Sequence, residues 1–300
     1  MRRHHTPLFG LALLAIVIAG LILPAQPRSA SAQDDGTTYP AVETGDYRGR
    51  IEICGAGRFY LLHVPPGYDG TEPLPLVLSY HGFTGDPVSN ATGTGWSEKA
   101  DQEKFFVVYP AGQNPQDPSQ LGWFTQPGAV EQGWLDDVRF TQDLILALIS
   151  GLNIDVHRIY LTGFSNGAGM VHRLACDLSG VIAAAGPISG PYFQGDPCDI
   201  AVPVPIFSIH GTYDRNAPFD GYYDVLEPVQ EWIKEWAERD GCEAEPTVMR
   251  LPQNITQQHW AACEGNSEVV MWLVEYGQHS WPRYATDVLW TFFEAHPLPG

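Results

Sequence analysis

A glycine-flanked serine is the feature of this sequence that most directly indicates catalysis. In Gly163-Phe-Ser165-Asn-Gly167 the serine lies between an apolar, β-branched run and a helix-like segment. Glycines are needed where a strand turns sharply into a helix, because a Cβ there would collide with neighbouring backbone. The turn lifts the hydroxyl clear of the sheet, at a helix N-terminus that favours developing negative charge. We therefore predict that Ser165 is the nucleophile of an acyl-transfer reaction.

A serine hydroxyl is a weak nucleophile at its ordinary pKa, so a base must lie within hydrogen-bond reach. The chain has ten histidines, and His279 is distinguished by its position. It lies in Tyr276-Gly-Gln-His279-Ser-Trp-Pro282, directly after the last apolar strand-like run and before the final helix-like stretch. Because parallel strands end at one edge of a sheet, that loop is expected beside the nucleophile turn. His279 is the predicted base.

An acidic residue should orient this base and should come between the serine and the histidine in chain order. Asp214 fits, because the apolar strand-like run before it ends at His210 and Gly211 provides the turn. Asp220 and Asp224 are rivals, but both lie further into the connection. We predict that Asp214 completes a catalytic triad.

Acyl transfer also needs hydrogen-bond donors where the oxyanion of the tetrahedral intermediate forms. One predicted donor is the backbone N–H of Asn166, directly after the nucleophile. The second is the backbone N–H of Phe83, in the His81-Gly-Phe-Thr84 loop that follows an aliphatic strand-like run. Thr84 is a possible side-chain contact to the substrate, and His81 is expected to brace the loop by a hydrogen bond.

Apolar runs of strand length alternate with helix-like stretches, which predicts an α/β fold with a parallel sheet covered on both faces. The predicted strands are Arg58–Val64, Leu74–Tyr80, Phe105–Tyr109, Arg158–Thr162, Ala183–Ile188, Val204–Ile209 and Val269–Val274. The predicted helices are Asp137–Ser150, Gly167–Leu174, Tyr222–Arg239 and Arg283–Phe293. One doubly wound domain over residues 48–300 is the simplest interpretation, preceded by a flexible leader over residues 33–47.

Residues 1–32 have the pattern of an export signal. Two arginines precede a long apolar run, and Ala30-Ser31-Ala32 provides a small-residue cleavage pattern. We therefore expect a secreted protein that is not held in a membrane after cleavage. The formal net charge of −19 makes nucleic acid and anionic membranes poor partners.

Five cysteines follow the predicted signal, and none lies in a spacing typical of zinc ligands, so no metal site is expected. In an exported chain, disulfides are the default interpretation. Proximity in the sequence favours Cys242–Cys263 and Cys176–Cys198, which leaves Cys54 unpaired.

Seven ordered motifs extend this pattern over most of the chain. They are Tyr60-Leu-Leu-His-Val-Pro-Pro-Gly67, Tyr80-His-Gly-Phe83, Val107-Val-Tyr-Pro110, Asp136-Asp137-Val138, the segment from Arg158 to Gly167, and His210-Gly-Thr-Tyr-Asp214 with Gly277-Gln-His-Ser-Trp-Pro282. Together they resemble the secreted poly(3-hydroxybutyrate) depolymerase and feruloyl esterase group of α/β-hydrolases. The resemblance implies an α/β-hydrolase fold and ester hydrolysis through a Ser-Asp-His triad, a chemistry that needs no cofactor. It also implies that Asp136-Asp137-Val138 caps a helix.

The short connection between the strands near Ser189 and Val204 leaves little room for a large lid, so an open cleft is expected. Its predicted lining consists of aromatic side chains that suit aromatic or extended acyl groups, namely Trp123, Phe124, Trp134, Tyr213 and Trp281. The expected substrate is a polyester oligomer or an aromatic ester of plant cell walls. A serine peptidase and a non-catalytic binding protein on the same scaffold are the alternatives, and the oligomeric state is left open.

Overall fold

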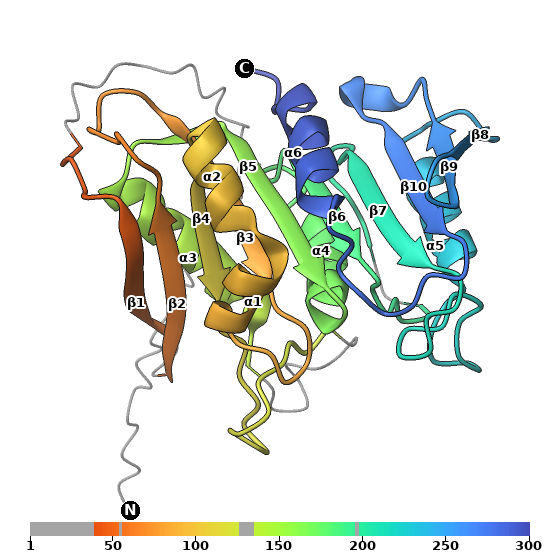
Figure 1. The fold of residues 1–300 in the computed structure, drawn as a ribbon, viewed down its shortest axis with the longest axis horizontal. Coiled ribbons are helices and arrows are strands. Elements are labelled where there is room, and N and C mark those ends of the chain that lie inside the picture. Colours follow the sequence, from red (N-terminus) through yellow and green to blue (C-terminus); the bar gives the residue numbers. More distant parts are fainter. Residues whose placement is uncertain (1–38, 54–55, 126–134, 196–197) are drawn as a thin grey trace, which may run out of the picture. The chain divides into compact units, whose positions relative to one another are not determined.

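Within the described residues, a ten-stranded mixed β-sheet forms the centre of the structure (Figure 1). The computed structural model describes residues 39–53, 56–125, 135–195 and 198–300. Those up to Pro299 belong to one compact unit, Asp35–Pro299. The strand order is β1-β2-β4-β3-β5-β6-β7-β10-β9-β8. The bounds are β1 Gly45–Ile53, β2 Ala56–Val64, β3 Leu74–Tyr80, β4 Phe106–Pro110, β5 Ile154–Phe164, β6 Ala184–Ile188, β7 Ile206–Gly211, β8 Thr247–Leu251, β9 Ile255–Trp260 and β10 Val269–Val274.

The six central strands, β4, β3, β5, β6, β7 and β10, run parallel to one another. Parallel sheets have both faces covered, and β6 and β7 are accordingly buried along their whole length. Antiparallel strands extend the sheet at both ends. At one end β2 pairs with β4 and β1 with β2, and at the other end β9 pairs with β10 and β8 with β9. The predicted doubly wound, mostly parallel sheet is confirmed.

Helices cover both faces of this sheet. One apolar core contains side chains of α3 (Asp137–Gly151), α4 (Asn166–Asp177) and α5 (Val229–Arg239). A second core, on the other face, contains side chains of α2 (Trp96–Glu103) and α6 (Ala285–Ala295), and α1 (Pro87–Thr94) lies on that side as well (Figure 1). No helix in the described ranges combines the length and the apolar character needed to cross a bilayer.

The elements differ from the prediction mainly outside the central parallel strands. Strand β1 begins at Gly45, inside the stretch predicted as a flexible leader, and pairs with β2 from Gly45 opposite Val64. Helix α5 begins only at Val229, not at Tyr222, because Pro228 before it has extended backbone. The strands β8 and β9, which follow β10 in the sheet, and the helices α1 and α2 were not predicted.

Two disulfides cross-link the domain as the sequence predicted. Cys176 near the end of α4 is bonded to Cys198, with their Cα atoms 5.1 Å apart. Cys242, just after α5, is bonded to Cys263, with a Cα separation of 3.7 Å. Cys54, predicted to be left unpaired, lies outside the described residues.

Candidate active site

The predicted site residues converge on the carboxyl ends of four parallel strands. The His81–Thr84 loop follows β3, and Ser165 follows β5 directly. Asp214 follows β7, and His279 follows β10. Since β3 pairs with β5, and β5 is followed in the sheet by β6, β7 and β10, these loops lie one after another along the same edge of the sheet. Ligand sites of open α/β sheets are typically found at this edge.

Ser165 has an unusual backbone conformation, with φ 55° and ψ −124°, and it is the N-cap residue of α4. The flanking glycines make this turn possible. A Cβ added to Gly163 would lie 2.5 Å from the carbonyl oxygen of Gly167, and one added to Gly167 would lie 2.2 Å from that of Tyr80. Since Cβ atoms do not approach backbone oxygens this closely, only glycine fits at either position, as the sequence pattern predicted.

Asp214 and His279 are directly hydrogen-bonded. The His279 Nδ1 lies 2.7 Å from the Asp214 Oδ2, and it must be the donor because a carboxylate only accepts. The Asp214 Oδ1 accepts the backbone N–H groups of Asn216 and Ala217, both at 2.9 Å. Burial alone would raise the pKa of Asp214, but the hydrogen bonds from His279 and Ala217 outweigh it and hold this pKa below its ordinary value. Asp214 is therefore ionised at neutral pH.

The His279 imidazole lies on the side of the molecule where Ser165 lies. Its ring packs against Phe164, the residue before the serine, with 4.7 Å between ring centroids. Because Nδ1 carries the proton donated to Asp214, the neutral ring presents an unprotonated Nε2. Among the described residues no hydrogen bond joins this ring to the Ser165 hydroxyl, a contact that often tightens only when substrate binds.

The loop after β3 is held in place by His81. The buried His81 ring accepts the backbone N–H of Gly112 at Nε2, 2.9 Å away, and donates from Nδ1 to the Gly82 carbonyl at 2.8 Å. Burial lowers the pKa of His81, which keeps the ring neutral and able to do both. The predicted bracing role of His81 is confirmed.

This loop lies against the nucleophile turn. A Cβ added to Gly82 would lie 3.3 Å from the Cβ of Ser165. Thr84, with φ 63°, donates its backbone N–H to the Leu121 carbonyl at 2.8 Å, so that N–H is not available to a substrate. The backbone N–H groups of Phe83 and Asn166 make no hydrogen bond within the described part of the chain.

Comparison with known proteins shows the family of this chain. The profile of the family described as esterase PHB depolymerase matches residues 58–207, half of the chain. The chain belongs to this esterase family. It is 29% identical over 254 residues to feruloyl esterase B of Piromyces equi, covering 81% of this chain and 46% of that one. It is 34% identical over 132 residues to poly(3-hydroxyalkanoate) depolymerase C of Paucimonas lemoignei, and the match covers 43% of this chain and 31% of that one.

The chain spans less than half of the length of either of these two relatives. Among solved structures it resembles the acetyl xylan esterase from Aspergillus awamori, with a TM-score of 0.63 and 18% identity over 82% of this chain and 99% of that one. This likeness supports the fold. The resemblance seen in the motifs is confirmed by this family membership.

The predicted substrate contacts of the esterase are placed unevenly. Thr84 and Tyr213 are exposed, and Trp281 is partly buried beside Phe83 and Phe164 in a cavity of about 330 Å³. The prediction for Trp123 was wrong, because its side chain is only 3% exposed. Phe124 is partly buried, and Trp134 lies outside the described residues.

Trp123 does not line a cleft but contacts the residues that hold the His81–Thr84 loop and the Ser165 turn in place. Its indole Nε1 donates to the His81 carbonyl at 2.9 Å, and its ring packs edge-on against Tyr80. The side chain of Asn166 pairs with the Trp123 backbone through two hydrogen bonds, accepting from the N–H at 2.7 Å and donating to the carbonyl at 2.9 Å. No sequence pattern indicated this pairing.

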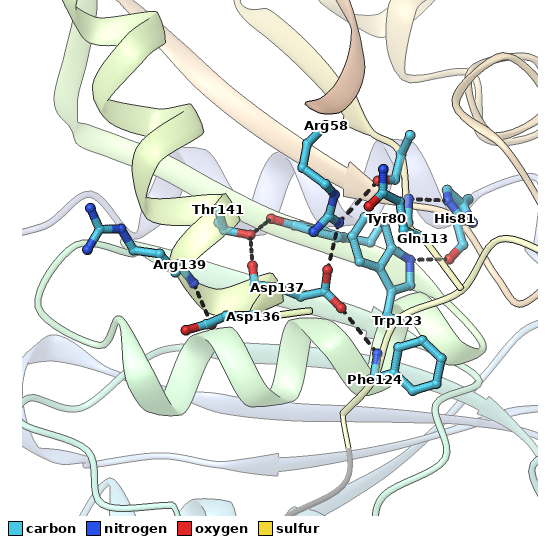
Figure 2. Close-up of polar contacts among 12 residues, drawn as sticks. Arg58, Tyr80, His81, Gln113, Trp123, Phe124, Asp136, Asp137, Arg139 and Thr141 are labelled. Atoms are coloured by element: carbon cyan, nitrogen blue, oxygen red, sulfur yellow. Dashed lines mark hydrogen bonds and ion pairs between the residues drawn. The ribbon is translucent and has the colours of Figure 1, made fainter. Parts of the chain in front are cut away.

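The predicted helix cap at the start of α3 divides into two roles. Asp136 is the N-cap residue, and its side chain accepts the backbone N–H of Arg139 at 2.9 Å. Asp137 does not cap the helix, because its carboxylate is buried and forms an ion pair of 2.6 Å with Arg58 (Figure 2). The expectation that the whole Asp136-Asp137-Val138 motif is a cap was therefore wrong for Asp137.

Proposed function

We propose that this esterase is a serine hydrolase in which Ser165 is the nucleophile, His279 the general base and Asp214 the residue that orients the base. The observation that carries the proposal is the 2.7 Å hydrogen bond between Asp214 and His279 at the sheet edge where Ser165 has its strained backbone. Such an arrangement activates a hydroxyl that would otherwise be unreactive.

The reaction follows from these positions. The Ser165 Oγ attacks the ester carbonyl while the His279 Nε2 takes its proton, and the Phe83 and Asn166 N–H groups receive the developing oxyanion. The imidazolium, held by Asp214, then protonates the departing alkoxide and leaves an acyl-enzyme. Water attacks this ester by the same path, and the acid is released as Ser165 recovers its proton.

The proposed substrates are esters with an aromatic or a hydroxyalkanoate acyl group. The cavity of about 330 Å³ beside the nucleophile turn has the aromatic side chains of Phe83, Phe164 and Trp281 in its lining. Aromatic rings bury large apolar area and can stack on a planar acyl group. Relatives named feruloyl esterase and poly(3-hydroxyalkanoate) depolymerase support the same two substrate classes.

Hydrolysis of methyl ferulate and of 3-hydroxybutyrate oligomers by the purified esterase tests the proposal, with p-nitrophenyl acetate as a general ester. We expect Ser165→Ala to lower turnover of every substrate by several orders of magnitude. An organofluorophosphonate should label the native chain and not the variant. Turnover that survives the Ser165 substitution would refute the mechanism, and activity on acetyl esters alone would refute the substrate assignment.

We also propose that the esterase is secreted after removal of residues 1–32. The apolar run and small-residue pattern of that stretch support export, and so do two disulfides, which persist mainly in oxidising compartments. N-terminal sequencing of protein collected from culture medium should begin at Gln33. Retention of the full-length chain in the cell would contradict the proposal.

A further inference from the structure

A short segment, residues 111–124, connects to the oxyanion loop His81–Thr84 at three points. The Gly112 N–H donates to the His81 Nε2 at 2.9 Å. The Leu121 carbonyl accepts the Thr84 N–H at 2.8 Å. The Trp123 indole donates to the His81 carbonyl at 2.9 Å. The position of the oxyanion loop therefore depends on the position of segment 111–124.

The segment folds back on itself, so its two ends lie together. A Cβ added to Gly112 would lie 2.6 Å from the carbonyl oxygen of Gly122, which shows how closely the two strands of backbone approach. A Cβ added to Gly122 would in turn lie 2.8 Å from the ring of Phe83, whose N–H is a proposed oxyanion donor. Displacing either end of segment 111–124 would therefore move the donor.

The buried ion pair between Arg58 and Asp137 holds both ends of segment 111–124 (Figure 2). Arg58, in β2, donates from Nη2 to the Asp137 Oδ1 at 2.6 Å and from the same nitrogen to the Ala111 carbonyl at 3.3 Å. Asp137, at the start of α3, accepts the Phe124 N–H at its Oδ2, 3.2 Å away. Both side chains are only 2% exposed.

Other contacts fix the pair itself in place. The Arg58 guanidinium lies over the Phe140 ring, 4.0 Å from its centroid. The Thr141 hydroxyl bonds to the Asp137 carbonyl and to the hydroxyl of Tyr80, the residue before His81 (Figure 2). One connected polar network thus runs from α3 to the end of β3. Because it is buried, each of its members depends on the others for its hydrogen bonds.

We propose that the Arg58–Asp137 ion pair is a positioning element for catalysis. It clamps the Ala111 and Phe124 ends of segment 111–124 and so fixes the Phe83 N–H relative to the reacting carbonyl. This inference rests on the proposed function, because it assigns a role within the same acyl transfer. Neither Arg58 nor Asp137 touches the substrate, so their loss should affect transition-state stabilisation more than ground-state binding.

Asp137→Asn is the direct test, because the amide preserves the volume and can still accept the Phe124 N–H but carries no charge for Arg58. With p-nitrophenyl acetate we expect kcat to fall about 10- to 100-fold, since complete loss of one oxyanion donor costs about 100- to 1,000-fold. KM should change by less than about twofold. The matched control is Asp143→Asn, on the same helix, which breaks the exposed pair with Arg139 and should leave kcat unchanged.

A tetrahedral adduct gives a second measurement. An arylboronic acid bonds to the serine oxygen and places a boron-bound oxygen where the oxyanion forms. Its Ki in Asp137→Asn should rise by the same factor by which kcat/KM falls. Unchanged kcat and Ki in this variant would overturn the proposal.

A double variant, Arg58→Met with Asp137→Leu, separates positioning from stability. Replacing both members of a buried ion pair by apolar residues is often neutral or stabilising. The melting temperature of the double variant should therefore be higher than that of Asp137→Asn and close to that of the native chain. Turnover should stay low, because neither side chain can hold Ala111 or Phe124. Recovery of turnover together with stability would show a structural role only. If Ser165→Ala retained wild-type turnover, the proposed function would fail independently of either result.

Discussion

Replacing Asp214 by Asn should disable the base while leaving the fold nearly intact, and the hydrogen bonds of the carboxylate show why. The Asp214 Oδ1 accepts two backbone N–H groups, from Asn216 and Ala217, and both require an oxygen at that position. The amide oxygen of the variant must therefore face these donors. Its NH2 group is then directed at the His279 Nδ1, where Oδ2 accepts in the native chain.

Two donors cannot face each other, so the imidazole must give up the proton on Nδ1 and carry it on Nε2. In that tautomer the nitrogen that faces Ser165 cannot accept a proton. The same substitution in a serine protease triad lowers kcat about 10,000-fold, and we expect a loss of similar size here. This factor corresponds to about 5.5 kcal/mol of transition-state stabilisation.

Steady-state hydrolysis of p-nitrophenyl acetate at pH 7 to 8 measures the effect, with circular dichroism to confirm the fold. Asp220→Asn is the matched control, because Asp220 lies in the same connection and is exposed. It should retain nearly full activity. If Asp214→Asn lowered kcat by less than about tenfold, or if the control Asp220→Asn lowered kcat by more than about tenfold, the tautomer argument would be refuted.

Three further predictions concern stability. Gly167→Ala should lower the free energy of unfolding, measured in urea, by at least about 3 kcal/mol, because its Cβ would lie 2.2 Å from the Tyr80 carbonyl oxygen. A variant as stable as the native chain would contradict this interpretation of the turn. Removing the Cys176–Cys198 disulfide, whose cysteines are 22 residues apart, should cost about 3 kcal/mol, measured by urea unfolding of the double alanine variant. The lowered pKa of Asp214 contributes stability that is present above about pH 4, the ordinary range of a carboxyl, and is lost as pH falls through the folded-state pKa. Thermal unfolding from pH 6 to pH 2 should therefore show a shallower acid loss for Asp214→Asn than for the native chain.

The central sheet and the sharp turn at Ser165 were predictable because their signals are local. Continuous apolar runs mark strands buried on both faces, and the glycines around Ser165 mark a turn that excludes a Cβ. The edge strands lack such a signal. Strand β8, Thr247–Leu251, is exposed along nearly its whole length, so no buried face imposes a pattern on its residues.

The support of the candidate site was not predictable, because it depends on partners far apart in the chain. Arg58 and Asp137 are 79 residues apart, and either one alone is indistinguishable from a surface charge. Asn166 is separated from Trp123 by 43 residues. A tryptophan near an active site can line a cleft or fill a core, and only the position of its N–H partner decides between them.

The left-handed backbone of Ser165 has a consequence for directed evolution of this esterase. Glycine adopts φ near 55° without the steric cost that a side chain brings, so the variant Ser165→Gly, which is unreactive under the proposed mechanism, should melt higher than the native protein. Libraries selected for heat tolerance alone would then be enriched in inactive variants substituted at position 165. Screens for robust variants should therefore require turnover in the same round.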